Sequence, residues 1–265
     1  MSLRTIIESL NIPPKARVDQ RIPKKTLVEH GTNSSSDKKL VQEGIEELFW
    51  VAALKPHNVG IPEFRDESRT YGEIAVLSFV VRPKAKRSRL VELIHRAIPY
   101  PTLLFGQQDD ILFASVANKR NALNQADAVV IDGEPFFVEW PEIQTGSPPV
   151  SEFLPTLSLA CVPRKHLLET CHHYRNQMIG LRSAQLTGLY IPAITESDAK
   201  VQEVSLARIE SLRAEIAALR AQANRERTMN RRVDLNLSVQ RLESELSELM
   251  RGLREVREFE RQIGN

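Results

Sequence analysis

YGEIAVLSFVV, residues 71–81, is the stretch of this chain that decides its fold class. It is β-branched and aromatic with little polarity, as expected of a strand that is covered on both faces. A helix is predicted directly after it, from about Ser88 to Ala97, because the segment lies between Pro83 and Pro99 and spaces its apolar residues for burial on one side. A buried strand followed by an amphipathic helix indicates a domain that mixes both element types.

Two hairpins are predicted downstream of this helix. In the first, the sequence GQQDD separates two apolar runs, residues 101–105 and 111–117. In the second, Asp132 and Gly133 separate two further apolar runs, and Asp-Gly is the strongest short hairpin signal in the chain. These segments supply most of the strands of a sheet.

A longer helix is predicted upstream, over Asp37–Leu54. Ser36 or Asp37 is its expected N-cap, and its apolar stripe ends before Pro56. The elements together predict an α+β fold: a mixed sheet of about five strands with packed helices, followed by a C-terminal α-helical coiled coil. The strand-rich core is expected at about 37–141, and a helical part at about 150–192 completes this domain.

The proline distribution marks the boundary between head and tail. All fifteen prolines lie at or before Pro192, and none follows. Because proline costs about 3 kcal/mol inside a helix, its absence permits very long helices. The sequence therefore predicts a head over residues 1–192 and a helical tail over 193–265.

Two apolar runs with helical spacing form the predicted coiled-coil seam of the tail. Their residues are Ile209, Leu212, Ile216, Leu219, Leu242, Leu246, Leu249, Leu253 and Val256. The two runs are out of register by two positions, so they do not share one uninterrupted seam. Between them, AQANRERTMNRRV (221–233) is polar and basic. It suits either a continuous solvated helix or a turn that folds the second helix back on the first.

Composition indicates the cellular compartment of the protein. Two cysteines are too few for a disulfide scaffold, which favours a reducing compartment and predicts a cytoplasmic protein. The N-terminal residues lack the apolar core of a signal peptide, so no export is expected. No apolar run approaches the roughly 20 residues of a membrane-spanning helix, so no membrane is expected as a partner.

Local charge is more informative than the balance of 36 basic and 34 acidic residues. The run RPKAKRSR, residues 82–89, carries five cations and no acid. Such a run can bind nucleic-acid phosphates by neutralising charge and releasing counterions, or it can be a solvated loop. Lys119 and Arg120 follow another predicted strand. They would form one basic surface with the run 82–89 if both loops open on the same side of the sheet. The candidate contacts are Lys84, Lys86, Arg87, Arg89, Lys119 and Arg120.

A second basic cluster lies in the tail, at Arg225, Arg227, Arg231 and Arg232. Acidic residues balance the tail as a whole. Pairing between helices is therefore the expected use of these arginines.

A metal-dependent nuclease is the alternative enzyme. Asp66 and Glu73 could hold a divalent metal that activates water against a phosphodiester. However, Ala75 occupies the position two residues after Glu73, where such a site needs a lysine. The sequence predicts no catalytic residues.

No metal or cofactor is predicted either. Cys161, His166 and the run Cys171–His173 contain zinc-type ligands, but they lack the tight C-x-x-C spacing of a structural zinc site. Buried thiols and surface histidines are the simpler interpretation. Neither G-x-x-x-x-G-K-[ST] nor G-x-G-x-x-G occurs, so no phosphate-cradling loop of those kinds is expected.

The order of several motifs resembles the bacterial domain-of-unknown-function family 4391. These motifs are RIPKK (21–25), LFWVAALKPHNVGIP (48–62), YGEIAVLSFVV (71–81), RAIPYPTLLF (96–105), NKR (118–120) and, in the tail, RERTMNRRVDLN (225–236). Members are often encoded beside helicases and DNA methyltransferases of restriction-like phage-defence clusters. The resemblance implies a non-catalytic accessory role in such a cluster and no known activity.

The leading hypothesis is accordingly an accessory subunit. Its tail associates with itself or with a larger protein partner, and its head presents a binding surface for which DNA is a candidate. The rival enzyme is the divergent nuclease using Asp66 and Glu73. A third hypothesis is a purely structural coiled-coil oligomerisation factor.

Overall fold

A computed structural model describes residues 2–32, 34–122, 128–142 and 148–263, with side chains described as far as Arg254. The chain divides into two compact units, Met1–Met178 (unit 1) and Ile179–Asn265 (unit 2). The division falls inside helix α7 (Leu167–Thr187), whereas the sequence suggests a boundary at Pro192.

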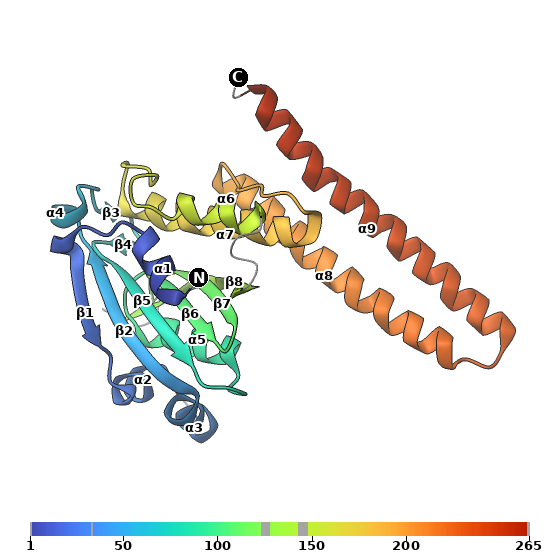
Figure 1. Cartoon of the computed structure of the whole chain (residues 1–265), viewed down its shortest axis with the longest axis horizontal. Helices are drawn as coiled ribbons and strands as arrows, with labels where there is room; N and C mark the ends of the chain where they lie inside the picture. Colours follow the sequence, from blue (N-terminus) through green and yellow to red (C-terminus); the bar gives the residue numbers. More distant parts are fainter. Residues whose placement is uncertain (1, 33, 123–127, 143–147, 264–265) are drawn as a thin grey trace. The chain divides into compact units, whose positions relative to one another are not determined.

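Unit 1 is built on a six-stranded mixed sheet in the order β1-β2-β5-β6-β7-β8 (Figure 1). The strands are β1 (Arg17–Arg21), β2 (Ile45–Leu54), β5 (Ile74–Val81), β6 (Thr102–Gln108), β7 (Ile111–Asn121) and β8 (Val129–Pro141). β5 and β6 pair in parallel, and the other neighbours pair antiparallel. A separate two-stranded ribbon joins β3 (Phe64–Arg65) and β4 (Thr70–Tyr71). The predicted mixed α+β architecture is confirmed.

The parallel pair is connected by helix α5 (Arg87–Ala97), as the sequence predicts. β5 is buried along most of its length, because helices cover both of its faces. At Gly106 of β6 the ring of Phe113 lies so close that an added Cβ would be 2.1 Å from its Cζ atom. The centre of the sheet therefore depends on a residue without a side chain.

Helices lie on both faces of the sheet (Figure 1). On one face, α2 (Lys24–Gly31), α3 (Ser35–Gly44) and α5 share an apolar core with β2, β5 and β6. On the other, α1 (Leu3–Ser9), α6 (Pro148–Thr156) and the first half of α7 cover the strands, and Phe153 of α6 contacts Trp140 of β8 edge to face. Two short helical segments, η1 (Pro14–Ala16) and α4 (Pro56–Val59), complete the unit.

The predicted helix over Asp37–Leu54 is wrong in its second half. The helix ends at Gly44, and Ile45–Leu54 forms β2 between β1 and β5. The pairing of β2 with β5 shifts register twice, between Ile45 and Glu47 and between Trp50 and Ala52. These bulges break the strict alternation of buried and exposed residues, so the apolar spacing of this strand imitates a helix.

The predicted hairpin at Asp132 and Gly133 is also wrong. β8 runs through both residues as one strand, and Gly133 adopts φ +75° at a register shift against β7. The left-handed conformation that glycine permits is used for a bulge and not for a turn. The first hairpin is confirmed, because β6 and β7 pair antiparallel across Asp109 and Asp110.

Unit 2 contains two long helices, α8 (Glu196–Arg225) and α9 (Met229–Ile263). They lie antiparallel (Figure 1), and ion pairs join Arg208 to Glu245, at 2.8 Å, and Arg220 to Glu243. The turned-back arrangement is thus the one adopted. It also accounts for the register difference between the two apolar runs, since each run belongs to a different helix.

The turn between α8 and α9 contains neither glycine nor proline. Glu226 stabilises the turn in their place. Its backbone N–H donates to the carbonyl of Gln222 at 3.0 Å, and its carboxylate accepts the N–H of Thr228 at 2.8 Å. These contacts satisfy backbone groups at the end of one helix and the start of the next. The N–H of Thr228 holds the pKa of Glu226 below its ordinary value.

The residues of the predicted seam are buried to different extents. Ile209, Leu212, Ile216 and Leu253 are buried, whereas Leu219, Leu242, Leu246 and Leu249 are half-buried. Val256 lies outside the residues whose side chains are described. The seam packs the two helices of one chain on each other.

Candidate functional site

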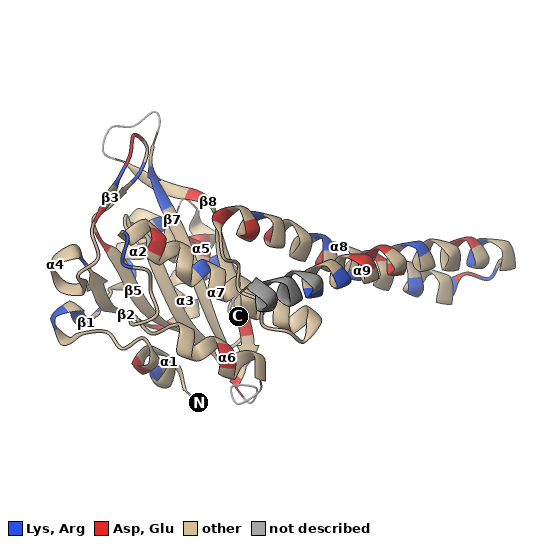
Figure 2. Ribbon diagram, turned by 90° about the horizontal axis from the view of Figure 1, so that it is seen from above, with Lys and Arg blue, Asp and Glu red and all other residues tan. Residues whose placement is uncertain are grey.

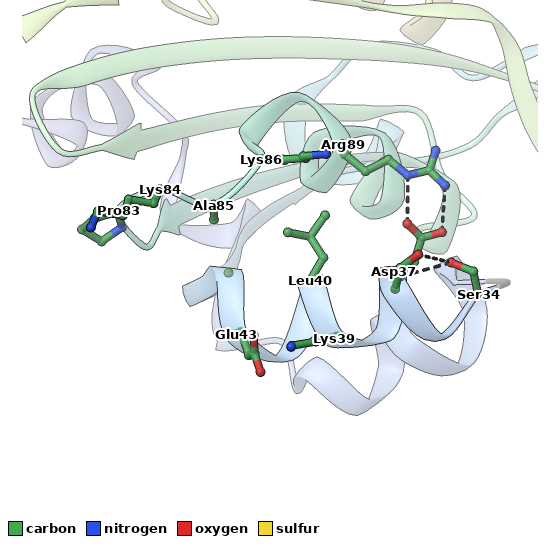
Figure 3. A pocket seen from close by; sticks show the side chains of 12 residues that line it. Ser34, Asp37, Lys39, Leu40, Glu43, Pro83, Lys84, Ala85, Lys86 and Arg89 are labelled. Atoms are coloured by element: carbon green, nitrogen blue, oxygen red, sulfur yellow. Dashed lines mark hydrogen bonds and ion pairs between the residues drawn. The ribbon is translucent and has the colours of Figure 1, made fainter.

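A pocket of about 830 Å³ lies in unit 1 between α3 and the loop from β5 to α5 (Figure 3). Leu40 points from α3 toward the loop, and Pro83 and Ala85 add apolar surface. Lys39, Lys84 and Lys86 also line it. The pocket thus combines an apolar wall with three lysines from two elements that are distant in sequence.

The loop is shaped by backbone contacts at both of its ends. The N–H of Arg82 donates to the carbonyl of Gly44 at 2.8 Å, which ties the end of β5 to the end of α3. Lys84 adopts φ +65°, an uncommon conformation for a residue with a side chain. Lys86 then serves as the N-cap of α5 without a capping side-chain bond. The two loop lysines are therefore presented by a defined turn.

α3 is held against α5 by Arg89 and Asp37. The Nε and Nη2 atoms of Arg89 donate to the two carboxylate oxygens of Asp37 at 3.0 and 2.7 Å, a bidentate pair. These bonds hold the pKa of Asp37 below its ordinary value. Ser34 caps α3 by accepting the N–H of Asp37 at 3.1 Å.

Lys24 fixes the other end of α3. Its ammonium donates to the carbonyl oxygens of Gln42 and Ile45, at 2.8 and 2.5 Å. Burial, together with the charges of Arg82 and Arg21, lowers its pKa. This contact gives the RIPKK segment a structural role beside the pocket.

The pocket is positively charged. Lys39, Lys84 and Lys86 are exposed, and none of them has an ion-pair partner among the residues that the structure describes. The first turn of α5 contains no acidic residue, so the positive end of that helix faces the same region. Of the two acids that line the pocket, Asp37 is neutralised by Arg89 and Glu43 is exposed. An anionic ligand is the chemistry that such a surface favours.

Two of the predicted phosphate contacts have structural partners instead. Arg87 donates to the side-chain oxygen of Gln108 at 2.8 Å, pairs with Glu139 and lies 5.6 Å from the ring centre of Phe113. Arg89 joins Asp37 and Glu92. Of the loop cations proposed from sequence, Lys84 and Lys86 alone lie in the pocket without such a partner in the described chain.

Lys119 and Arg120 lie at the opposite end of the strands. Ala117 is level with Ala75 at the start of β5, whereas Ile111 is level with Val81 at its end. Lys119 is 2% exposed, and Arg120 approaches Asp132 at 3.8 Å. The two basic loops therefore do not form one surface, and Lys119 is closed to solvent.

The two acids considered for a nuclease are engaged separately. Asp66 accepts the backbone N–H groups of Ser68 and Arg69 and pairs with the Arg69 side chain at 2.7 Å, which lowers its pKa to about 2. Glu73 pairs with Lys55 at 3.0 Å. Within the described part of the chain, no three His, Cys, Asp or Glu side chains gather as a metal site would require.

The cysteines and histidines of zinc-ligand type are dispersed. Cys161 is exposed, and Cys171 is buried, which raises the pKa of its thiol. His166 contacts the ring of Phe64, with 4.7 Å between ring centres, and His173 bonds to the carbonyl of Thr156 at 2.9 Å. Both imidazoles therefore have roles in packing unit 1.

A family model described as domain of unknown function (DUF4391) matches residues 10–246. The chain belongs to the DUF4391 family. The resemblance seen in the sequence motifs is confirmed, and the matched range includes the pocket, α8 and the first half of α9. Neither the curated proteins nor the solved structures contain a match to this DUF4391 chain. None of its described helices is both long and apolar enough to cross a membrane.

Lys39 is the pocket residue that sequence reasoning missed in this DUF4391 chain. It lies in Lys38-Lys39 near the start of α3, and nothing local indicates that it faces residues 83–86. Contacts between residues far apart in sequence bring them together: the pair between Arg89 and Asp37, and the bond from Arg82 to Gly44.

Proposed function

We propose that the chain is a non-catalytic accessory subunit that binds nucleic acid through phosphate contacts at the pocket of unit 1. The observation that carries this proposal is that Lys39, Lys84 and Lys86 line one cavity and have no carboxylate partners in the described chain. Lysines of this kind bind phosphate oxygens as point charges, and affinity follows from the release of counterions.

The composition of the pocket favours binding without base recognition. Base edges are read mainly by Arg or Lys at guanine and by Asn or Gln at adenine, and single-stranded bases stack on aromatic rings. A lysine on an exposed, flexible stem acts chiefly as a point charge toward phosphate. The described lining contains no Asn, Gln or aromatic residue, and its one arginine, Arg89, is held by Asp37 and Glu92. The expected ligand is therefore the sugar–phosphate backbone, independent of sequence.

Unit 2 supplies the second half of the proposed role. The antiparallel helices α8 and α9 are packed through an apolar seam and interhelical ion pairs, features that coiled coils share. We propose that this coiled-coil element associates with a further copy or with a larger protein. We propose, on the strength of the family resemblance, that such a subunit acts in a restriction-like phage-defence or DNA-processing complex.

The proposal is tested by fluorescence anisotropy with a short labelled DNA duplex at low salt. The variant Lys39→Glu, Lys84→Glu, Lys86→Glu should lose about tenfold or more in affinity, because three phosphate contacts become repulsive. The control variant Lys15→Glu, Arg65→Glu, Lys165→Glu makes the same charge change at exposed cations elsewhere on unit 1. Equal losses in both variants, or no binding by the wild type, would refute the pocket as the site.

A further inference from the structure

The turn end of the hairpin carries four arginines that the interhelical contacts do not use. Arg225, Arg227, Arg231 and Arg232 are all exposed, and none lies within ion-pair distance of a carboxylate in the described part of the chain. The pairing between α8 and α9 is made instead by Arg208 and Arg220. The sequence-based expectation that the four arginines pair between helices is not met.

The surroundings of these arginines are weakly acidic. Residues 225–234 contain four arginines and two acids, Glu226 and Asp234. Glu226 is committed to the turn through the N–H of Thr228. Figure 2 shows the basic residues at the turn that joins α8 and α9. A positive excess therefore remains at this end of the hairpin.

The start of α9 adds to this positive potential. α9 is 35 residues long, and no acidic residue lies in its first turn. The N-terminal backbone N–H groups of a helix carry a partial positive charge, which adds to the arginines beside them. Exposed Asn224 and Asn230 supply further hydrogen-bond donors. Arginine is the side chain best suited to planar, bidentate contacts with phosphate.

We propose that the turn end of the hairpin, formed by Arg225, Arg227, Arg231 and Arg232, is a second binding site for nucleic-acid phosphates. The inference rests on the proposed function and deepens it, because the chain then binds nucleic acid through two separate elements. Two weak sites on one chain raise the overall affinity through effective concentration when a single nucleic acid reaches both. The pocket of unit 1 and the turn end would each be partial contacts.

An acidic protein surface is the competing ligand. Met229 and Leu237 are 63% and 48% exposed at the same end, and an apolar stripe of this kind suits a protein partner. The concentration of arginine and asparagine, together with the phosphate chemistry proposed for unit 1, favours nucleic acid. The test must therefore separate these two ligands.

The first measurement is the affinity of the full chain for a labelled duplex over a range of salt concentrations. Replacing Arg227, Arg231 and Arg232 with Gln should lower the affinity about tenfold or more and make the log–log salt dependence shallower by about 2.7. The control replaces Lys200, Arg213 and Arg241, three cations elsewhere on the hairpin, with Gln. Unchanged affinity and salt dependence in the Arg227, Arg231 and Arg232 variant would overturn the proposal.

The second measurement identifies what the turn end touches. A photo-crosslinking amino acid at Asn230 of the full chain, irradiated with the duplex present, should yield a protein–DNA adduct. An adduct between two protein chains and none with DNA would assign the turn end to protein association and overturn the proposal. The Lys39, Lys84 and Lys86 variant is measured in the same series. If it binds like the wild type while the arginine variant does not, the pocket fails and the turn end stands.

Discussion

The ammonium group of Lys119 donates a hydrogen bond to the backbone carbonyl of His95, a carbonyl to which Pro99 has no N–H to donate. In a helix this carbonyl would accept the N–H of the residue four positions later, and proline has none. Lys119 thus completes the end of α5 from β7. Its backbone N–H donates to the hydroxyl of Tyr71 at 3.1 Å. This bond gives the N–H a partner at a position of β7 that lies beyond the last residue paired with β6. The lysine is a structural residue of the core.

Burial at this position predicts a pH dependence of stability. The pKa of Lys119 is lowered from 10.5 to about 8. Between these pH values the unfolded chain binds a proton at Lys119 that the folded chain does not, so the free energy of unfolding rises with pH across this window. The total gain is about 3 kcal/mol.

Urea unfolding of the wild type and of Lys119→Met, from about pH 7.5 to about pH 10.5, measures this gain. The difference between the two proteins should move in favour of the wild type as the pH rises. Tyr71, whose pKa is raised by burial, is present in both and cancels. Parallel pH profiles would contradict the assignment.

The pocket should not distinguish DNA sequences. Duplexes of equal length that are rich in A·T or in G·C should bind with affinities within about threefold of each other, because contacts to phosphates carry no direct base information. Competition titrations measure the ratio. A preference of about tenfold or more would show that side chains of the chain contact base edges, and would contradict binding through phosphates alone.

Two glycines of different surroundings should respond oppositely to alanine. Gly106→Ala should lower the free energy of unfolding by about 3 kcal/mol, because its Cβ would lie 2.1 Å from Phe113 and 2.7 Å from the carbonyl of Phe79. Gly252→Ala, in α9, meets nothing within 4 Å and should raise it by about 0.5–1 kcal/mol. Chemical denaturation of both variants decides the matter, and a tolerated Gly106→Ala would show that β6 and β7 can separate.

The chain should not cleave nucleic acid. Asp66 is fixed by Arg69 and the backbone of its own turn, and Glu73 is paired with Lys55, so neither is placed beside a third carboxylate in the described chain. Incubation with supercoiled, linear and single-stranded DNA in magnesium or manganese should leave every substrate intact. Cleavage that disappears in Glu73→Ala would promote the nuclease and remove the accessory-subunit hypothesis.

Some of the fold follows from local sequence. α5 begins and ends within a residue of its prediction, because Pro83 and Pro99 limit it on both sides. β2 does not follow, because its two bulges arise from pairing with β5 and alter the spacing on which the prediction depends. Gly133 shows the same limit: Asp132 and Gly133 predict a turn from local sequence, but β8 pairs with β7 on both sides of Gly133, so this residue forms a bulge.

The candidate site divides in the same manner. Lys84 and Lys86 could be found in a run of cations, since exposure of such a loop is a local property. The engagement of Arg87 by Glu139 and of Arg89 by Asp37 could not be found, because each partner is contributed by a distant element. The fold thus uses two of the five cations of this run, Arg87 and Arg89, as internal supports and leaves Lys84 and Lys86 available.

The two bulged edge strands of the sheet affect how readily this protein aggregates at high concentration. β1 and β8 are the outer strands, and each is kinked, at Asp19 (φ +50°) and at Gly133. β8 also contains Pro135, which has no N–H to offer. A strand from a neighbouring molecule would find neither edge flat for its full length, so end-to-end joining of sheets into aggregates is disfavoured. Both margins are thereby protected by the geometry of their own strands.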